Sequence, residues 1–331
     1  TNDGNTSGQS GSAYFGRNVA MSGDGNYLIV GSDHDDSYGS NRGAAYIFKK
    51  ENGSWNIKQR IGGGSGQSNS DHFGWSCDIN YDGSVVVVGI PYDDPAGTDS
   101  GRIHIWERSG ESWSQPATAT PPDSNSYQYF GRQVSINGAG TIIAVGAYQR
   151  DQSGNQSGEV YVYTYDINAN SLSLEAQILP TDGTISANDY FGSSLCLDKT
   201  GTKLVVGAER DDQTNSDSGS AYYFYRSVGS PFTWTQGQRL NSPNPSTSAY
   251  FGNSICISPD ATVLAIGAYN DDTYGSNWGA VYIYDWNAGT QSWDYSETIG
   301  PDLPATTNNS QGKSSLYFSY SESTHGRTIG L

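Results

Sequence analysis

A Phe-Gly pair recurs five times along this chain of 331 residues, at Phe15, Phe73, Phe130, Phe191 and Phe251. The gaps between successive pairs are 58, 57, 61 and 60 residues. Self-similarity at a nearly fixed period is the signature of a repeat architecture, in which each unit is one supersecondary element that packs on its neighbours. The sequence therefore predicts five stacked units rather than one mixed domain.

Each unit has the same succession of apolar segments after its Phe-Gly pair. The second segment is apolar at successive positions, so both of its faces must be buried, as in a sheet between two others. The third is β-branched and aromatic, a composition typical of strands. The second segments are 27–31, 85–89, 142–146, 204–207 and 264–267, and the third are 45–48, 103–106, 160–163, 221–224 and 281–284. With a first strand at the Phe-Gly pair and a fourth after a hairpin, each unit predicts four antiparallel strands. Radial repetition of such units gives an all-β fold, the β-propeller.

A known family shares these residues. The Phe-Gly pair that opens each unit, and the Gly43, Gly101, Gly158, Gly219 and Gly279 that precede the third strands, resemble the FG-GAP repeat of integrin α-chain propellers and their relatives. The resemblance covers roughly residues 13 to 300 and implies a propeller. Its members serve in adhesion, ligand binding and structure, so it does not by itself define a function.

The repeat divides the chain into three parts. Residues 1–12 form an N-terminal arm, and residues 13–300 hold five complete units, 13–62, 71–120, 128–180, 189–241 and 249–300. Residues 301–331 form a linker and a C-terminal tail of strand-like sequence. The tail is interpreted as a partial sixth unit or as a separate strand, which leaves both a five-bladed and a six-bladed closure open.

Calcium binding in the integrin manner is not expected. The loops between first and second strands are short hairpin turns with few carboxylates, whereas Ca²⁺ needs six to eight oxygen ligands. Acidic pairs follow the second strands instead and are candidates for weak calcium sites: Asp35, Asp36, Asp93, Asp94, Asp211, Asp212, Asp271 and Asp272. In the other interpretation these carboxylates accept hydrogen bonds from backbone N–H groups and fix the loops. Arg150, which takes the place of the first Asp in the third unit, favours this second interpretation, because a cation site would not contain an Arg. No cofactor is expected beyond weakly bound Ca²⁺.

Charge and composition exclude two classes of partner. The net charge is −17, with 17 basic residues and no basic cluster, which argues against nucleic acid and against anionic membrane surfaces. Membrane insertion is not expected, because no apolar run approaches the ~20 residues needed to span a bilayer. The polar start of the chain, Thr1 to Asn5, predicts a processed form of an extracellular or cell-surface protein. Four sequons are candidate glycosylation sites, at Asn5, Asn52, Asn155 and Asn308.

No catalytic motif is visible, and the protein is predicted not to be an enzyme. His34 lies in an acidic loop, His72 stands where the other units have Tyr before Phe-Gly, and His104 occupies a strand position otherwise held by Tyr. The last two are interpreted as packing residues that replace a structural Tyr.

The function predicted from the sequence is a non-enzymatic extracellular structural or adhesion module. Its tail would pair with neighbouring molecules by strand addition and build an oligomer or filament. The assembly residues would be Leu316, Tyr317, Phe318, Tyr320 and Ile329, and the partners copies of the chain itself, a cell-surface protein or a glycan. The alternatives are a carbohydrate-binding lectin and, third, an enzyme whose active site is built from loops.

Overall fold

The computed structural model describes residues 13–62, 67–123, 125–151 and 155–300. The N-terminal arm and the C-terminal tail lie outside this range, as do the five predicted assembly residues and the sequons at Asn5 and Asn308. Asn52 and Asn155 are exposed.

The described residues form five four-stranded antiparallel sheets, each with its strands in chain order from the axis outward, so the predicted all-β propeller is confirmed. Blade 1 holds β1 (Val19–Met21), β2 (Tyr27–Ser32), β3 (Ala44–Glu51) and β4 (Ser54–Ile61). Blade 2 holds β5 (Ser76–Ile79), β6 (Val85–Ile90), β7 (Arg102–Ser109) and β8 (Ser112–Ala119). Blade 3 holds β9 (Gln133–Ile136), β10 (Ile142–Ala147), β11 (Glu159–Asp166) and β12 (Ser171–Ile178). Blade 4 holds β13 (Phe191–Leu197), β14 (Lys203–Ala208), β15 (Ser220–Arg226) and β16 (Trp234–Asn241), and blade 5 holds β17 (Phe251–Ile257), β18 (Val263–Ala268), β19 (Ala280–Asn287) and β20 (Ser292–Ile299). No helix that could cross a membrane occurs in this part of the chain.

Glycine lets adjacent blades meet backbone to backbone. A Cβ on Gly43 or Gly101 would overlap the backbone of the Phe that opens the next blade, and both glycines have φ near +80 to +88. These contacts are parallel β-bridges, for example Gly43 to Phe73 and Gly101 to Phe130. The repeated glycines are therefore required by close approach as well as by backbone conformation.

Side chains of the innermost strands also link one blade to the next. A side chain of one blade accepts a backbone N–H of the following blade at each of the four interfaces. The pairs are Asn18 with Cys77 at 2.9 Å, Asp78 with Ile136 at 2.8 Å, Ser135 with Leu197 at 3.1 Å, and Cys196 with Ile257 at 3.3 Å. The innermost strands, which pair with one strand of their own sheet, thus gain a hydrogen bond to the innermost strand of the adjacent blade.

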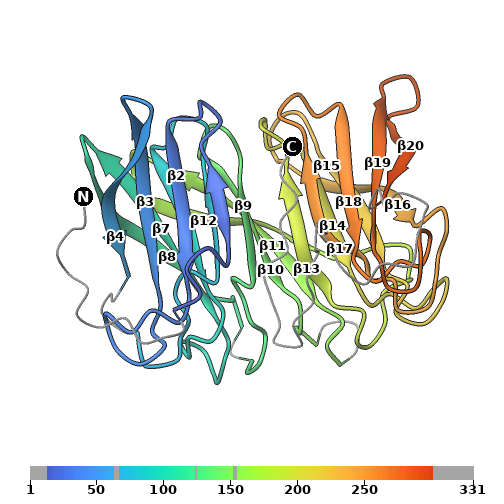
Figure 1. Cartoon of the computed structure of the whole chain (residues 1–331), viewed down its shortest axis with the longest axis horizontal. Coiled ribbons are helices and arrows are strands. Elements are labelled where there is room, and N and C mark those ends of the chain that lie inside the picture. Colours follow the sequence, from blue (N-terminus) through green and yellow to red (C-terminus); the bar gives the residue numbers. More distant parts are fainter. Residues whose placement is uncertain (1–12, 63–66, 124, 152–154, 301–331) are drawn as a thin grey trace, which may run out of the picture.

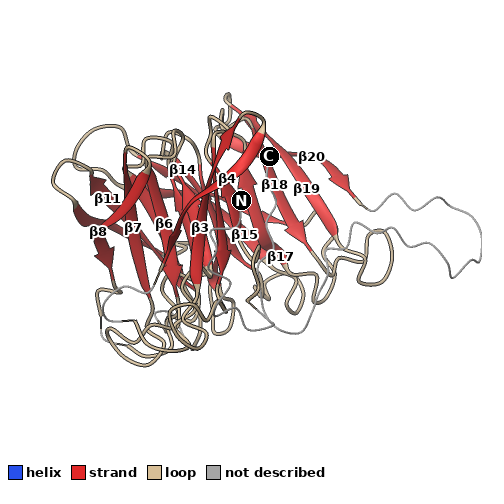
Figure 2. Cartoon of the chain, turned by 60° about the vertical axis from the view of Figure 1, so that its left-hand side comes forward, coloured by secondary structure: helices blue, strands red, loops and turns tan. Residues whose placement is uncertain are grey.

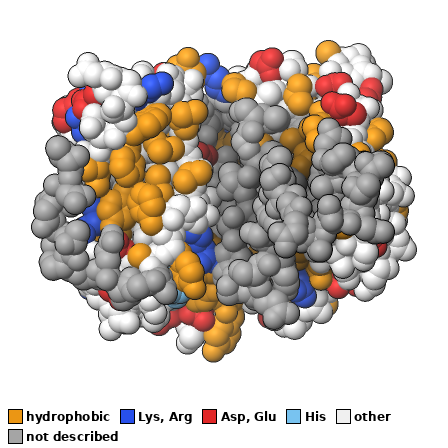
Figure 3. All heavy atoms as spheres, in the orientation of Figure 1, with side chains coloured by type: hydrophobic (Ala, Val, Ile, Leu, Met, Phe, Trp, Pro, Cys, Tyr) orange, Lys and Arg blue, Asp and Glu red, His pale blue; other side chains and the backbone are white. Residues whose placement is uncertain are grey.

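The blades follow one another in chain order along an arc, with blade 1 in blue and blade 5 in orange at opposite sides (Figure 1). Among the described residues, no extensive strand contact joins blade 5 to blade 1. Phe73, Phe130, Phe191 and Phe251 are each 0% exposed, whereas Phe15 is 56% exposed. The Phe-Gly repeat predicts that all five rings are buried, and this prediction is wrong for Phe15, because no preceding blade covers it. Hydrophobic side chains gather over β2 and β3 on the face of blade 1 that is turned toward the viewer (Figure 3).

Candidate functional site

The long loops of all five blades lie at one end of the propeller. The second strand of each blade runs toward this end and the third runs away from it, so the loop between them and the connection to the next blade meet there. Figure 2 shows these loops along its lower edge. We call this end, around the axis, the axial mouth. Residues far apart in the sequence converge on it.

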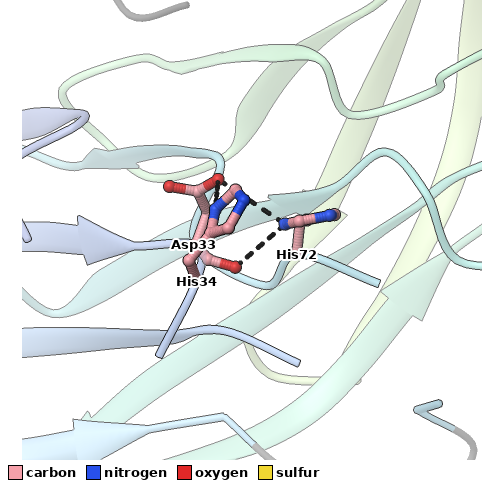
Figure 4. A group of neighbouring side chains, drawn as sticks. All are labelled: Asp33, His34 and His72. Carbon is pink, nitrogen blue, oxygen red and sulfur yellow. Dashed lines mark hydrogen bonds and ion pairs between the residues drawn. The ribbon is translucent and has the colours of Figure 1, made fainter. Parts of the chain in front are cut away.

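Asp33, His34 and His72 form a compact cluster at the axial mouth (Figure 4). Asp33 and His34 follow β2, and His72 comes from the connection to blade 2. Nδ1 of His34 lies 2.8 Å from Oδ2 of Asp33, and Nδ1 of His72 lies 3.1 Å from the backbone oxygen of Asp33. Because both oxygens are acceptors, each Nδ1 carries the proton, which leaves each Nε2 as the basic atom.

Arg17 neutralises the carboxylate of this cluster. Its Nη1 lies 2.9 Å from Oδ2 of Asp33, and both side chains are almost fully buried. Burial lowers the pKa of Arg17 to about 10, so the guanidinium remains charged at neutral pH. The second oxygen of Asp33, Oδ1, is buried and has no hydrogen-bond partner among the described residues. Oδ2 of Asp33 thus contacts both the Arg17 guanidinium and the His34 ring, and it orients His34.

The histidines are partly exposed, and the pKa of His34 is lowered. Burial is the main cause that lowers the pKa of His34, with Asp33 opposing it and His72 adding to it. The two imidazole rings lie 4.4 Å apart between centroids. A neutral imidazole oriented by a buried carboxylate is the arrangement that general-base catalysis uses.

The same three residues could also hold a metal ion, since two imidazoles and a carboxylate are ligands of divalent transition metals. They are the one group of three or more His, Cys, Asp or Glu side chains with suitable spacing among the described residues, and their ligand atoms lie within 4.8 Å of one another. However, Oδ2 of Asp33 already binds the Arg17 guanidinium. A cation on that oxygen would lie against another cation, so proton transfer fits the geometry better than metal binding.

A belt of aromatic rings continues from the cluster around the axial mouth. The ring of Tyr92 lies 4.9 Å from His72 and 5.1 Å from Trp75. Further contacts join Tyr92 to Tyr129 at 5.2 Å, Tyr129 to Tyr148 at 5.6 Å and Tyr148 to Tyr190 at 5.1 Å. Such rings stack on the apolar faces of sugars while polar groups beside them bind hydroxyls.

The residue before each Phe-Gly pair has a strained backbone. Its φ is positive in every blade: 49° at Tyr14, 59° at His72, 54° at Tyr129, 59° at Tyr190 and 56° at Tyr250. A bulky residue in this region costs about 1–3 kcal/mol. In three blades its N–H donates to the last part of the preceding long loop, as from His72 to the backbone oxygen of Asn41 at 3.2 Å. The fold thereby projects an aromatic or imidazole ring at the mouth from each blade.

The predicted calcium candidates stabilise the long loops. The second carboxylate of each pair accepts the N–H five residues on: Asp36 from Asn41, Asp94 from Asp99, Asp212 from Asp217 and Asp272 from Asn277. Asp35, Asp211 and Asp271 each accept a backbone N–H at 2.8 Å and a Tyr hydroxyl, and Asp93 pairs with Arg102 at 2.6 Å. These bonds are those of the loop-fixing interpretation, and calcium binding at the pairs stays a prediction.

Sequence reasoning singled out neither Asp33 nor Arg17, and it treated His34 and His72 as unrelated. The available signal was the departure of two neighbouring units from the repeat. His72 replaces Tyr, and Asp33 stands two residues after the strand-two Gly, where the third and fifth units have Tyr148 and Tyr269.

The fold and the mouth together define a β-propeller with a polar, aromatic-lined axial site. The FG-GAP repeat family matches residues 4–48, 58–106, 113–163, 172–224 and 234–284, and the chain belongs to this family. Integrin alpha-2 of Mus musculus is 29% identical over 156 residues, which are 44% of this chain and 12% of the integrin. The chain therefore spans only a small part of that relative.

Solved structures share the fold at low identity. A functionally unknown protein from Desulfotomaculum acetoxidans DSM 771 has a TM-score of 0.58 at 12% identity, covering 86% of this chain and 70% of that one. The periplasmic gluconolactonase PpgL of Pseudomonas aeruginosa has a TM-score of 0.58 at 14% identity, covering 86% and 72%. A protein from Lactobacillus plantarum has a TM-score of 0.54 at 14% identity, covering 85% and 70%. At these identities the likeness shows the fold alone.

These comparisons overturn the function predicted from the sequence. The prediction of a non-enzymatic adhesion module that builds filaments is contradicted, because a propeller of the same fold is a gluconolactonase and the comparisons give no support to adhesion or assembly. The exclusion of an enzyme was wrong for a physical reason. A propeller site is assembled from loops of different blades, so its residues form no local motif.

Proposed function

We propose that the axial mouth between blades 1 and 2 is the active site of a hydrolase for a small polyhydroxylated lactone or ester. The observation that carries the proposal is the buried carboxylate and imidazole pair, with Oδ2 of Asp33 2.8 Å from Nδ1 of His34. The pair is flanked by a guanidinium and by aromatic rings, which suit a polar ligand with apolar faces. The gluconolactonase of similar fold acts on a ligand of this class.

The reaction needs only groups at the mouth and water. Nε2 of His34 takes a proton from a water molecule whose oxygen attacks the carbonyl carbon of the lactone. The ring C–O bond then breaks, and the imidazolium returns its proton to the leaving alkoxide, which gives a hydroxy acid. Asp33 holds the imidazole in the correct tautomer and stabilises its charged form.

Hydrolysis of glucono-δ-lactone, followed by acid release above the spontaneous rate, tests the proposal. His34→Gln should lower kcat by about 100-fold or more, because it removes the base. Asp33→Asn should lower kcat while the fold, measured by circular dichroism, is retained. Lys58→Gln, on the outer strand β4, is the control and should match the wild type. Failure of the wild type to accelerate this lactone and a panel of neutral lactones and esters would contradict the proposal.

A carbohydrate-binding protein without activity is the second candidate. The aromatic belt of Tyr92, Tyr129 and Tyr148 favours it, because stacked rings alone bind sugars. Saturable binding of a sugar that is not turned over, unchanged in His34→Gln, would identify this function.

We also propose that the protein acts outside the cell. FG-GAP repeats are shared with an integrin α chain, a cell-surface protein class, and the high negative charge suits a soluble extracellular domain. Immunodetection in the medium or on intact source cells would support this location, and recovery only after lysis would refute it.

A further inference from the structure

Two guanidinium groups bracket one indole ring at the axial mouth. Arg17, Trp75 and Arg132 each stand two residues after the Phe of blades 1, 2 and 3. Cζ of Arg17 lies 3.6 Å from the centroid of the Trp75 ring, and Cζ of Arg132 lies 4.5 Å from it. A guanidinium stacked on a ring keeps its N–H edge available for a planar acceptor.

In the part of the chain that the structure describes, only one of the two cations has a carboxylate partner. Arg17 pairs with Asp33, whereas Arg132 contacts the ring of Tyr148 at 5.2 Å and forms no ion pair with a carboxylate of the described residues. Four other partly buried arginines do have a carboxylate partner: Arg102 with Asp93, Arg150 with Glu159, Arg226 with Glu175 and Arg239 with Asp211. Arg132 is also close enough to Arg17 to lower its pKa. Arg132 therefore lies beside a second guanidinium and has no carboxylate counter-ion of its own among the described residues.

A partly buried cation without a counter-ion is costly, and an anionic ligand would remove that cost. A carboxylate matches the guanidinium fork in shape and forms two parallel charge-assisted hydrogen bonds. The aromatic belt beside Arg132 supplies the surface for the rest of a sugar-like molecule. Both features lie on the side of the mouth adjacent to His72 and Trp75.

We propose that Arg132 binds the carboxylate of a sugar acid, so that the ligand class of the axial mouth is a polyhydroxylated carboxylate. This inference rests on the proposed function for the identity of the site, and it adds a specificity residue to it. Arg132 selects the acid over the neutral sugar, while His34 remains the base.

Binding of D-glucuronate and D-glucose to the full chain tests the inference, because the two ligands differ in a carboxylate. Titration is followed by calorimetry and by tryptophan fluorescence, to which Trp75 contributes from between the two guanidinium groups. The wild type should bind glucuronate at least about tenfold more tightly than glucose, as one charge-assisted hydrogen bond implies. The preference should weaken as salt is added.

Arg132→Gln should abolish this preference without changing the affinity for glucose, and Arg132→Lys, which keeps the charge but not the fork, should be intermediate. Arg108→Gln is the matched control, because Arg108 lies at the hairpin end of blade 2, against Gly83 and Tyr27. Equal binding of both sugars, no binding of either, or an unchanged preference in a folded Arg132→Gln would overturn the inference. Glucuronate binding without lactone hydrolysis would leave the inference standing and refute the hydrolase. Lactone hydrolysis without a preference for glucuronate over glucose would support the hydrolase and overturn the inference.

Discussion

Replacing His104 by Tyr should stabilise the protein and reduce its acid sensitivity. His104 lies in β7, is 2% exposed, and neither ring nitrogen has a hydrogen-bond partner among the described residues. The other four blades have Tyr at this position, Tyr46, Tyr161, Tyr222 and Tyr282, and each hydroxyl donates to a buried carboxylate. The ring of His104 packs 5.8 Å from Phe73, much as Tyr161 packs 5.4 Å from Phe130. A Tyr therefore has an equivalent place in blade 2.

The size of the effect follows from the pKa. Burial, with a smaller contribution from Arg102, lowers the pKa of His104 from 6.5 to about 3. Between these values the unfolded chain binds a proton at this residue and the folded protein does not, so stability is lost as the pH falls below 6.5. Near pH 5 the loss is roughly 2 kcal/mol. A Tyr at this position takes up no proton in this pH range, so the loss does not occur. Its hydroxyl near Asp93 should raise the free energy of unfolding by about 1–2 kcal/mol at neutral pH.

Guanidinium unfolding of the wild type and of His104→Tyr, followed by Trp fluorescence at about pH 7.5 and about pH 5, measures both the gain at neutral pH and its change with pH. Other buried groups act in the opposite direction, since burial raises the pKa of Asp71, Asp78 and Asp189 to about 6 and their protonation stabilises the fold as the pH falls. These contributions are common to both proteins and cancel in the difference. The advantage of His104→Tyr should widen by roughly 2 kcal/mol between the two pH values. A difference that is independent of pH would refute the reasoning.

Three further predictions concern packing between and within blades. Gly89→Ala should lower the free energy of unfolding by at least about 3 kcal/mol, because a Cβ there would overlap the backbone of blade 3. Gly110→Ala has no atom within 4 Å of the added Cβ and should lower it by only about 1 kcal/mol, because of its positive φ. Equal losses in denaturant unfolding would be inconsistent with this. Phe130→Ala should cost about 3–5 kcal/mol, and the half-exposed Phe15→Ala under about 1 kcal/mol, a contrast that thermal unfolding can check. Tyr222→Phe should cost about 1–3 kcal/mol, because it leaves a buried carboxylate short of one donor. A neutral result in urea unfolding would show that Arg239 and the backbone N–H of Gln213 are sufficient partners for the Asp211 carboxylate.

The repeat made the fold predictable, because its physical requirements are local. A Phe that fills the space between sheets and a Gly where backbones touch recur at fixed spacing, and the family and the propeller are both confirmed. The burial of four Phe rings follows from the same pattern. The exposure of Phe15 does not, since its environment depends on how the ends of the arc meet rather than on its own unit.

The site was not predictable in the same way. Asp33 and His72 are 39 residues apart, and they meet because Gly43 docks on Phe73 and brings the next blade against the loop after β2. The interpretation of His72 as a substitute for a structural Tyr was correct about its backbone, which has the same positive φ as its counterparts. It did not predict the contact of His72 with Asp33, because Asp33 lies in another blade.

The strained position before Phe-Gly explains how a structural repeat can carry a site. Every blade places a ring there at a backbone cost of about 1–3 kcal/mol, and in three blades a hydrogen bond to the preceding long loop helps to hold it. In the blades that carry Tyr the ring only extends the aromatic belt. Where the ring is an imidazole, and the neighbouring loop supplies Asp33 and His34, the same geometry presents basic nitrogens beside a buried anion. Three residues of adjacent units thus place imidazole nitrogens beside a buried anion without altering the blade, and the proposed acid-base function would use this arrangement.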